Sequence, residues 1–76
     1  MTKLTITNNI RKLRFFANEM TQSELAERAG ISRQTVVALE AGKYTPTLEL
    51  AFRLADVFGV EIGEVFERKD ESARTE

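Results

Sequence analysis

Gly30 stands between two short segments with helical apolar spacing, and each segment begins with a residue that caps helices. Thr21 and Glu24 have the spacing of a capping box, in which the two side chains accept backbone N–H groups at a helix start. Ser32 opens the second segment in the same way. Glycine at a helix end takes the left-handed conformation that other residues avoid. We therefore expect residues 20–43 to form two short helices joined by a tight turn at Gly30.

The apolar pattern of the remaining chain predicts three more helices. One helix is expected over residues 8–18, and Thr47 caps another over Leu48–Phe58 that ends at Gly59. A short last helix follows and is weakened by Gly63. The predicted fold class is all-α, a compact five-helix bundle in one domain. The side chains expected to form its core include Ile10, Leu13, Phe16, Ala17, Leu25, Ala26, Ala29, Ile31, Val36, Leu39, Leu50, Ala51, Leu54, Ala55 and Phe58.

Both ends of the chain lack a clear helical pattern. Leu4 and Ile6 alternate with threonines, but a single strand of this length cannot stand alone. Residues 1–7 are therefore predicted to be a flexible lead-in, with a strand that pairs across a dimer as the alternative. Residues 67–76 are charged, with one apolar residue, and are predicted to be a disordered tail. The folded domain is expected to span residues 8–66.

The composition excludes several classes of function. The 76 residues include no cysteine and no histidine, which removes disulfides, thiolate metal sites and the commonest general base. The chain has no clustered carboxylates and no glycine-rich phosphate loop, so we expect neither an enzyme nor a metal or other cofactor. It has no signal-peptide pattern and no run of about 20 apolar residues that would span a membrane. A domain of this size without disulfides is expected in the cytoplasm.

The charges are unevenly distributed along the chain, although the net charge is only −1. Seven basic residues face four acidic ones up to Tyr44, whereas four basic residues face eight acidic ones from Thr45 onward. Such a distribution would place a polyanion against the first half of the domain. Ordinary variation of surface charge explains it equally well.

The helix-turn-helix segment carries a more specific pattern, which continues into the fourth and fifth helices. Its positions are Thr21-Gln22-x-x-Leu25-Ala26, Gly30-Ile31-Ser32, Val36-x-x-Leu39-Glu40-x-Gly42-Lys43, Tyr44-x-Pro46-x-Leu48, Leu54-Ala55 and Phe58-Gly59-Val60. Over residues 8–66 this pattern resembles the Cro and phage-repressor type of helix-turn-helix, the Xre family. The resemblance implies a lambda-repressor-like DNA-binding domain whose recognition helix corresponds to Ser32 through Ala41.

The resemblance also implies roles for individual residues. Arg33 and Gln34 stand at the first exposed turn of the recognition helix, and their forked polar groups suit the edges of guanine and adenine. Base readout is expected from Arg33, Gln34, Thr35 and Ala38. Phosphate contacts are expected from Gln22, Ser32, Lys43, Tyr44 and Thr47, although Ser32 and Thr35 suit either kind of contact. Arg14 and Glu40 are expected to form a structural ion pair.

The sequence departs from the family pattern in two places. Ala41 stands where family members frequently have Asn or Arg, so one backbone contact to DNA is missing. The link from Phe15 to Met20 is about one residue longer than the commonest form. This longer link is expected to shift Arg14 relative to Glu40.

One such domain offers too little helix for a selective DNA site, so a two-fold homodimer on paired half-sites is expected. Its interface would come from the last helix, although the same residues would equally complete the core. We expect a sequence-specific transcriptional regulator that binds double-stranded DNA, in particular a repressor of a palindromic operator. The alternative is an antitoxin-like module that binds a protein partner and regulates its own operon. The residues proposed for the dimer interface are Ile62, Val65 and Phe66.

Overall fold

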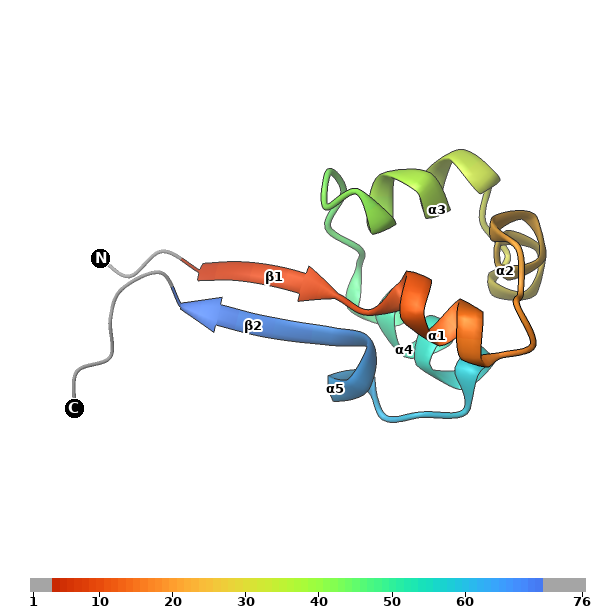
Figure 1. The fold of residues 1–76 in the computed structure, drawn as a ribbon. Coiled ribbons are helices and arrows are strands. Elements are labelled where there is room, and N and C mark those ends of the chain that lie inside the picture. Colours follow the sequence, from red (N-terminus) through yellow and green to blue (C-terminus); the bar gives the residue numbers. More distant parts are fainter. Residues whose placement is uncertain (1–3, 71–76) are drawn as a thin grey trace.

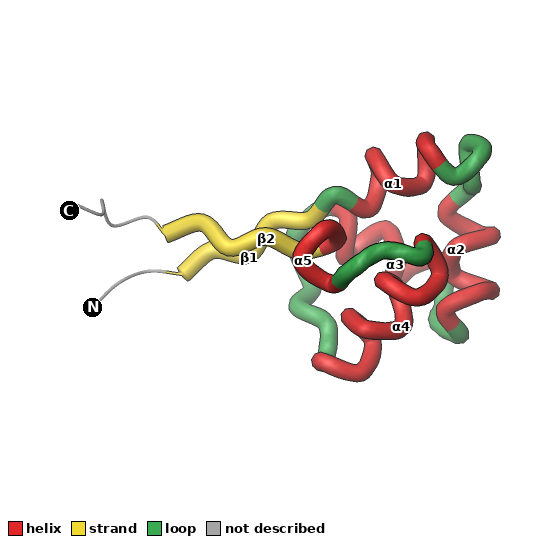
Figure 2. The backbone as a smooth tube through the Cα atoms, turned by 90° about the horizontal axis from the view of Figure 1, so that it is seen from below, coloured by secondary structure: helices red, strands yellow, loops and turns green. Residues whose placement is uncertain are grey.

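The computed structural model describes residues 4–70 and folds them into a helical body with a short β-ribbon projecting from it (Figures 1 and 2). The expected five helices are present, and a two-stranded sheet accompanies them, so the all-α description is only approximate. The elements in chain order are β1 (Leu4–Asn8), α1 (Ile10–Phe16), α2 (Gln22–Ala29), α3 (Arg33–Glu40), α4 (Leu48–Phe58), α5 (Ile62–Val65) and β2 (Phe66–Asp70).

The helix-turn-helix forms as its capping residues predict. The N–H of Glu24 donates to the Thr21 hydroxyl at 3.0 Å, and the N–H of Thr21 donates to the Glu24 carboxylate at 2.8 Å. Ser32 caps α3 by accepting the Thr35 N–H at 3.1 Å. Gly30 has φ +74°, which ends α2 in the left-handed conformation and turns the chain into α3. The predicted capping box and the glycine turn are both confirmed.

The last two helices differ in length for local reasons. Thr47 starts α4 by accepting the Leu50 N–H at 3.1 Å, and Gly59 ends it at φ +68°. α5 has only 4 residues, consistent with the low helix propensity of Gly63. The longest helix, α4, has 11 residues, and within residues 4–70 no helix has the length and apolar character needed to cross a membrane.

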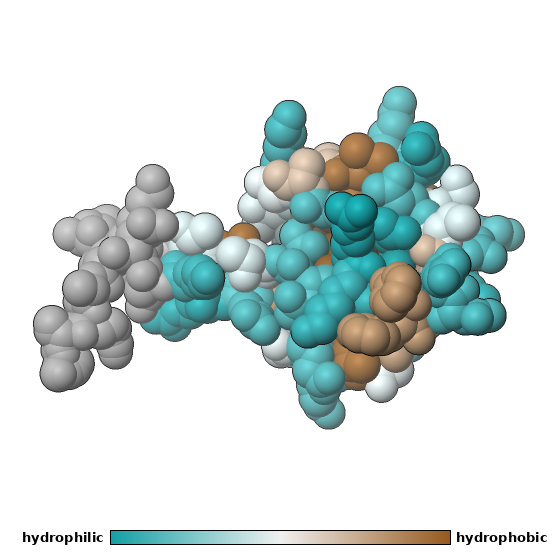
Figure 3. Space-filling model, in the orientation of Figure 1, coloured by the Kyte–Doolittle hydropathy of each residue, from teal (hydrophilic) through white to brown (hydrophobic). Residues whose placement is uncertain are grey.

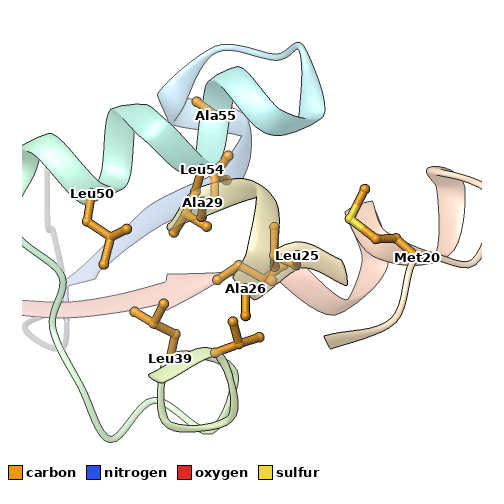
Figure 4. Close-up of a cluster of buried hydrophobic side chains, with 11 residues drawn as sticks. Met20, Leu25, Ala26, Ala29, Leu39, Leu50, Leu54 and Ala55 are labelled. Carbon is orange, nitrogen blue, oxygen red and sulfur yellow. The ribbon is translucent and has the colours of Figure 1, made fainter. Parts of the chain in front are cut away.

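One core holds the helices together, and Figure 4 shows part of it. Ile10 at the start of α1 and Val65 at the end of α5 are both fully buried, so residues far apart in the sequence share this core. Each fully buried side chain of this size contributes about 1.5–3 kcal/mol. The buried cluster consists of Ile10, Met20, Leu25, Ala26, Ala29, Val36, Leu39, Leu50, Leu54, Ala55 and Val65.

α1 is shorter than predicted, and one of its assigned core residues is wrong. The helix ends at Phe16, whose side chain is 69% exposed because Ile10, Leu13 and Ala17 form the face of this segment that packs on the core. Asn18 and Glu19 follow with φ values of +64° and +56°, which reverses the chain. The reversal brings Met20 into the core, with 6% of its surface exposed. The apolar pattern did not single out Met20. Its side chain thus takes the place in the core that was predicted for Phe16.

The two chain ends pair with each other where a lead-in and a disordered tail were predicted. β1 and β2 are antiparallel, with Ile6 opposite Arg68 and Asn8 opposite Phe66. The Asn9 N–H donates to the Val65 carbonyl at 2.8 Å, which fixes the register where both strands leave the body. The predicted lead-in is therefore wrong for residues 4–7 and the predicted disordered tail for residues 67–70, because backbone hydrogen bonding does not require apolar side chains. Residues 1–3 and 71–76 lie outside the described part of the chain.

Candidate nucleic-acid interface

α3 presents a largely polar outer edge because Val36 and Leu39 turn inward. Val36 and Leu39 are 0% and 1% exposed, and they anchor the helix in the core. Arg33 and Gln34, in the first turn, are exposed. Val37 is 41% exposed one turn further along. Of the residues expected to read bases, Arg33 and Gln34 are thus free to reach a ligand, while Thr35 and Ala38 are half-buried beside them.

Two hydroxyl groups are fixed at the start of α3. The Ser32 and Thr35 hydroxyl oxygens lie 2.9 Å apart, within hydrogen-bonding distance. Ser32 also accepts the Thr35 N–H, so its hydroxyl serves as the helix cap. Both side chains therefore have defined orientations at the helix N-terminus, where backbone N–H groups favour an anion.

A network of polar side chains ties α1, α2 and α3 together. Arg14 donates from Nε to Glu40 Oε2 at 2.6 Å and from Nη2 to Glu40 Oε1 at 3.1 Å, which confirms the expected ion pair. Gln22 Nε2 donates to the same Oε1 at 3.2 Å. Arg14 also donates to the carbonyl of Met20 at 2.9 Å. The longer link after α1 therefore does not separate Arg14 from Glu40, and Gln22 is oriented by the same carboxylate.

A hollow of about 510 Å³ lies at the N-terminus of α2 and reaches α3. Gln22 and Arg33, expected to contact phosphate and base respectively, both line it, and so does Arg11 from α1. Hydrophilic side chains dominate this face between α1 and α3 (Figure 3). Glu19 and Glu40 also line the hollow, and Glu40 is paired with Arg14. The first N–H groups of α2 together with Arg11 offer positive charge to an anion such as a phosphate. Arg11 was not assigned from the sequence, although its position three residues before Arg14 on a basic helix was the available signal.

The loop after α3 carries the remaining residues expected to contact phosphate. Gly42 ends the turn at φ +74°, and the Lys43 N–H donates to the Ala38 carbonyl at 2.9 Å. The side chains of Lys43 and Tyr44 are exposed on this loop. Thr47 is also exposed, but its hydroxyl caps α4. These residues lie apart from the hollow at α2, on the other side of α3.

The three residues expected at a dimer interface differ in what they can offer. Val65 is fully buried within its own chain, so it has no side-chain surface left for a partner. Its assignment to an interface therefore does not hold. Ile62 and Phe66 are half-buried and pack against the edge of the core.

The family model described as "Helix-turn-helix" matches residues 10–65, which include all five helices. The chain belongs to the Xre-type helix-turn-helix family. Members of this family are DNA-binding regulators, and the chain is accordingly a helix-turn-helix transcriptional regulator and not an enzyme. This match spans the network of Arg14, Gln22 and Glu40 and the exposed edge of α3.

Named relatives of this family come from archaea, bacteria and a phage. An uncharacterized HTH-type transcriptional regulator of Methanocaldococcus jannaschii is 45% identical over 62 residues, which cover 79% of this chain and 94% of the relative. Another from Archaeoglobus fulgidus is 50% identical over 52 residues, or 68% of this chain and 74% of the relative. The cryptic phage CTXphi transcriptional repressor RstR of Vibrio cholerae is 36% identical over 59 residues. That match covers 78% of this chain and 52% of RstR.

Proposed function

We propose that this chain is a sequence-specific repressor that acts in the cytoplasm by occupying a palindromic DNA operator as a homodimer. The observation that carries the proposal is the position of the exposed Arg33–Gln34 edge beside the hollow at α2. In that arrangement a phosphate held at the start of α2 fixes how deeply α3 enters the major groove. Contacts to phosphates position the protein, and contacts to base edges then supply the sequence preference.

Base readout is assigned to the exposed face of α3. Arg33 provides the bidentate donors that suit guanine O6 and N7, and Gln34 provides the donor and acceptor that suit adenine. Ala38 offers a methyl surface for a thymine methyl group in the next turn. Thr35 is oriented by Ser32 and lies beside this edge. Which base each side chain meets depends on how the helix docks in the groove.

Phosphate contacts are assigned on both sides of α3. On one side lie Gln22, the first N–H groups of α2 and Arg11, all at the hollow. On the other side lie the exposed side chains of Lys43 and Tyr44. Ser32 and Thr47 offer the N-termini of α3 and α4, with their hydroxyls engaged as caps. A strand of phosphates on each flank of the major groove would thus be held while α3 lies between them.

The homodimer follows from the small surface that one α3 can read. Two such helices on half-sites about 34 Å apart double the number of base contacts. Ile62 and Phe66, at the junction of α5 and β2, provide half-buried apolar surface for this pairing. The repressor role is supported by the likeness to RstR, which is named a transcriptional repressor.

Replacement of Arg33 by alanine tests the assignment of the reading edge. DNA sequences bound by the wild-type chain and by Arg33→Ala would be selected from a random pool and compared. We expect the variant to lose its preference at one base pair of each half-site, worth about 1–3 kcal/mol. Arg28→Ala is the matched control, because Arg28 is an exposed arginine at the end of α2 that does not line the hollow. An unchanged sequence preference in Arg33→Ala would exclude α3 as the reader.

A further inference from the structure

The exposed apolar side chains of residues 5–69 fall into groups, and the proposed DNA interface accounts for only one of them. Val37 and Tyr44 lie on α3 and on the loop that follows it, and Ile6 lies on the ribbon. The others form two adjacent pairs, one on α1 and one on α4, and none of these four side chains is assigned to DNA. Single exposed apolar residues are ordinary, whereas contiguous apolar surface with a polar rim is typical of sites that bind another molecule. These pairs are Phe15 with Phe16 on α1 and Leu48 with Phe52 on α4.

The outer face of α1 is apolar and basic. Phe15 and Phe16 are 62% and 69% exposed, and their rings contact each other edge to face with centroids 5.6 Å apart. A hollow of about 450 Å³ runs along this face beside both rings. Arg11, Lys12, Asn8 and Asn9 complete its lining, so the hollow contains two cations and no acidic group. Its chemistry suits an apolar side chain that is accompanied by a carboxylate.

The outer face of α4 has the complementary character. Leu48 and Phe52 are 69% and 51% exposed and stand one helical turn apart. Asp56 is exposed a further turn along the same face. Glu49 also lies on this face, where Arg53 pairs with it at 2.6 Å. The α4 face therefore has two apolar side chains and the carboxylate of Asp56, whereas the lining of the hollow on the α1 face has no carboxylate.

The two faces point away from each other. Figure 2 shows α1 and α4 at opposite sides of the helical body, and each helix turns its buried residues toward the core between them. One chain cannot bring its own two faces together. A second copy can, and because the two faces differ, the contact is heterologous and leaves one free face at each end. α3 lies on neither side, so its reading edge stays free in such an assembly (Figures 1 and 2).

We propose that copies of this chain associate head to tail, with the Phe15–Phe16 face of α1 in one copy docked on the Leu48–Phe52 face of α4 in the next. Lys12 of one copy then faces Asp56 of its neighbour, which adds a charge pair to the apolar contact. The contact is separate from the two-fold pairing proposed for operator binding, and it can repeat to form a row of copies. It requires no DNA and does not depend on the proposed operator.

Disulfide trapping tests the proposal, because the chain has no cysteine of its own. Full-length Lys12→Cys and Asp56→Cys variants would be oxidised separately and as an equimolar mixture, without DNA. Mass spectrometry would distinguish the three possible disulfide-linked dimers. We expect the mixed dimer to form about tenfold faster than either like dimer, because docking raises the effective concentration of the two thiols. Glu27→Cys on the exposed side of α2 is the control, and its mixtures should react only at the rate of random collision.

A second substitution tests the direction of the contact. Phe15→Ser in the copy that carries Lys12→Cys should abolish the fast reaction, since it removes the docking ring from the reacting face. Phe15→Ser in the copy that carries Asp56→Cys should leave the rate unchanged, because that copy contributes only α4. If a like dimer formed faster than the mixed dimer, each face would pair with the same face of a second copy, and the proposal would be overturned. Equal rates for all mixtures, including the control, would overturn it in favour of a different protein as partner.

Discussion

At the scale of single residues, Glu40 connects the fold to the proposed reading surface. It is the last residue of α3, and its carboxylate accepts hydrogen bonds from Arg14 on α1 and from Gln22 on α2. The side chains of Arg14 and Glu40 are only 16% and 11% exposed, so water replaces these bonds poorly. One carboxylate therefore holds three helices together and orients the glutamine at the hollow.

Replacing Glu40 by alanine should lower the free energy of unfolding by about 2 kcal/mol, because a half-buried arginine loses its charged partner. Urea unfolding of the wild-type chain and the variant measures this difference. Glu40→Gln keeps the shape and one acceptor, so a smaller loss is expected. DNA affinity should fall in Glu40→Ala even where the variant is fully folded, since Gln22 loses its orientation. Equal stability of all three proteins would show that the ion pair contributes nothing to folding.

At the level of helices and turns, the glycines differ in backbone conformation and therefore in their effect on stability. Gly30, Gly42 and Gly59 have positive φ values where helices or turns end. Gly63 lies within α5, and apart from its chain neighbours and the backbone of its own helix no atom lies within 4 Å of where its Cβ would be. A side chain at Gly30 would meet Arg53 at an ordinary 3.4 Å, so the constraint there is the backbone conformation and not the available space.

This difference predicts opposite effects for the same substitution. Gly30→Ala should destabilise the chain by about 1 kcal/mol, because alanine resists the left-handed conformation. Gly63→Ala should stabilise it by about 0.5–1 kcal/mol through its higher helix propensity. Thermal and urea unfolding of the two variants, compared with the wild-type chain, measure both values. A stabilised Gly30→Ala would mean that the turn between α2 and α3 does not need its left-handed residue.

At the scale of the whole molecule, the ribbon joins the chain ends to the helical body. Asn8 donates to the carbonyl of Leu39 on α3 at 2.9 Å and accepts the N–H of Ile10 at 3.1 Å. Asn9 donates to the carbonyl of Glu64 on α5 at 3.0 Å. These two asparagines anchor the ribbon to both ends of the helical sequence. Hydrogen bonds from these two residues thereby connect the ribbon to α3 and α5.

The salt dependence of DNA binding measures how many cationic side chains of the dimer contact phosphate. With Arg11 and Lys43 as cations in each chain, a dimer neutralises about four phosphates and the slope of log K against log salt is about −3.6. A fourfold rise in salt should then weaken binding about 150-fold. Lys43→Ala should halve the slope, whereas Lys12→Ala on the α1 face should leave it unchanged on a single operator. An unchanged slope in Lys43→Ala would remove Lys43 from the phosphate contacts.

The elements that depend on local chemistry could be predicted from the order of residues alone. The caps at Thr21, Ser32 and Thr47 and the glycine turn at Gly30 depend on neighbouring backbone groups, so their positions are readable from the order of residues. The family pattern likewise indicated the Arg14–Glu40 pair. Of the proposed site, the exposure of Arg33 and Gln34 on α3 was predictable from the inward spacing of Val36 and Leu39.

Features that depend on partners distant in the sequence became apparent only in the folded chain. β1 and β2 pair through backbone hydrogen bonds between residues about 60 positions apart, which side-chain patterns do not encode. Val65 is buried instead of exposed because Ile10 and the helices close over it. Arg11 joins Gln22 and Arg33 at one hollow only after three helices have packed. Caps act over a few bonds, whereas these features require the chain to fold back on itself.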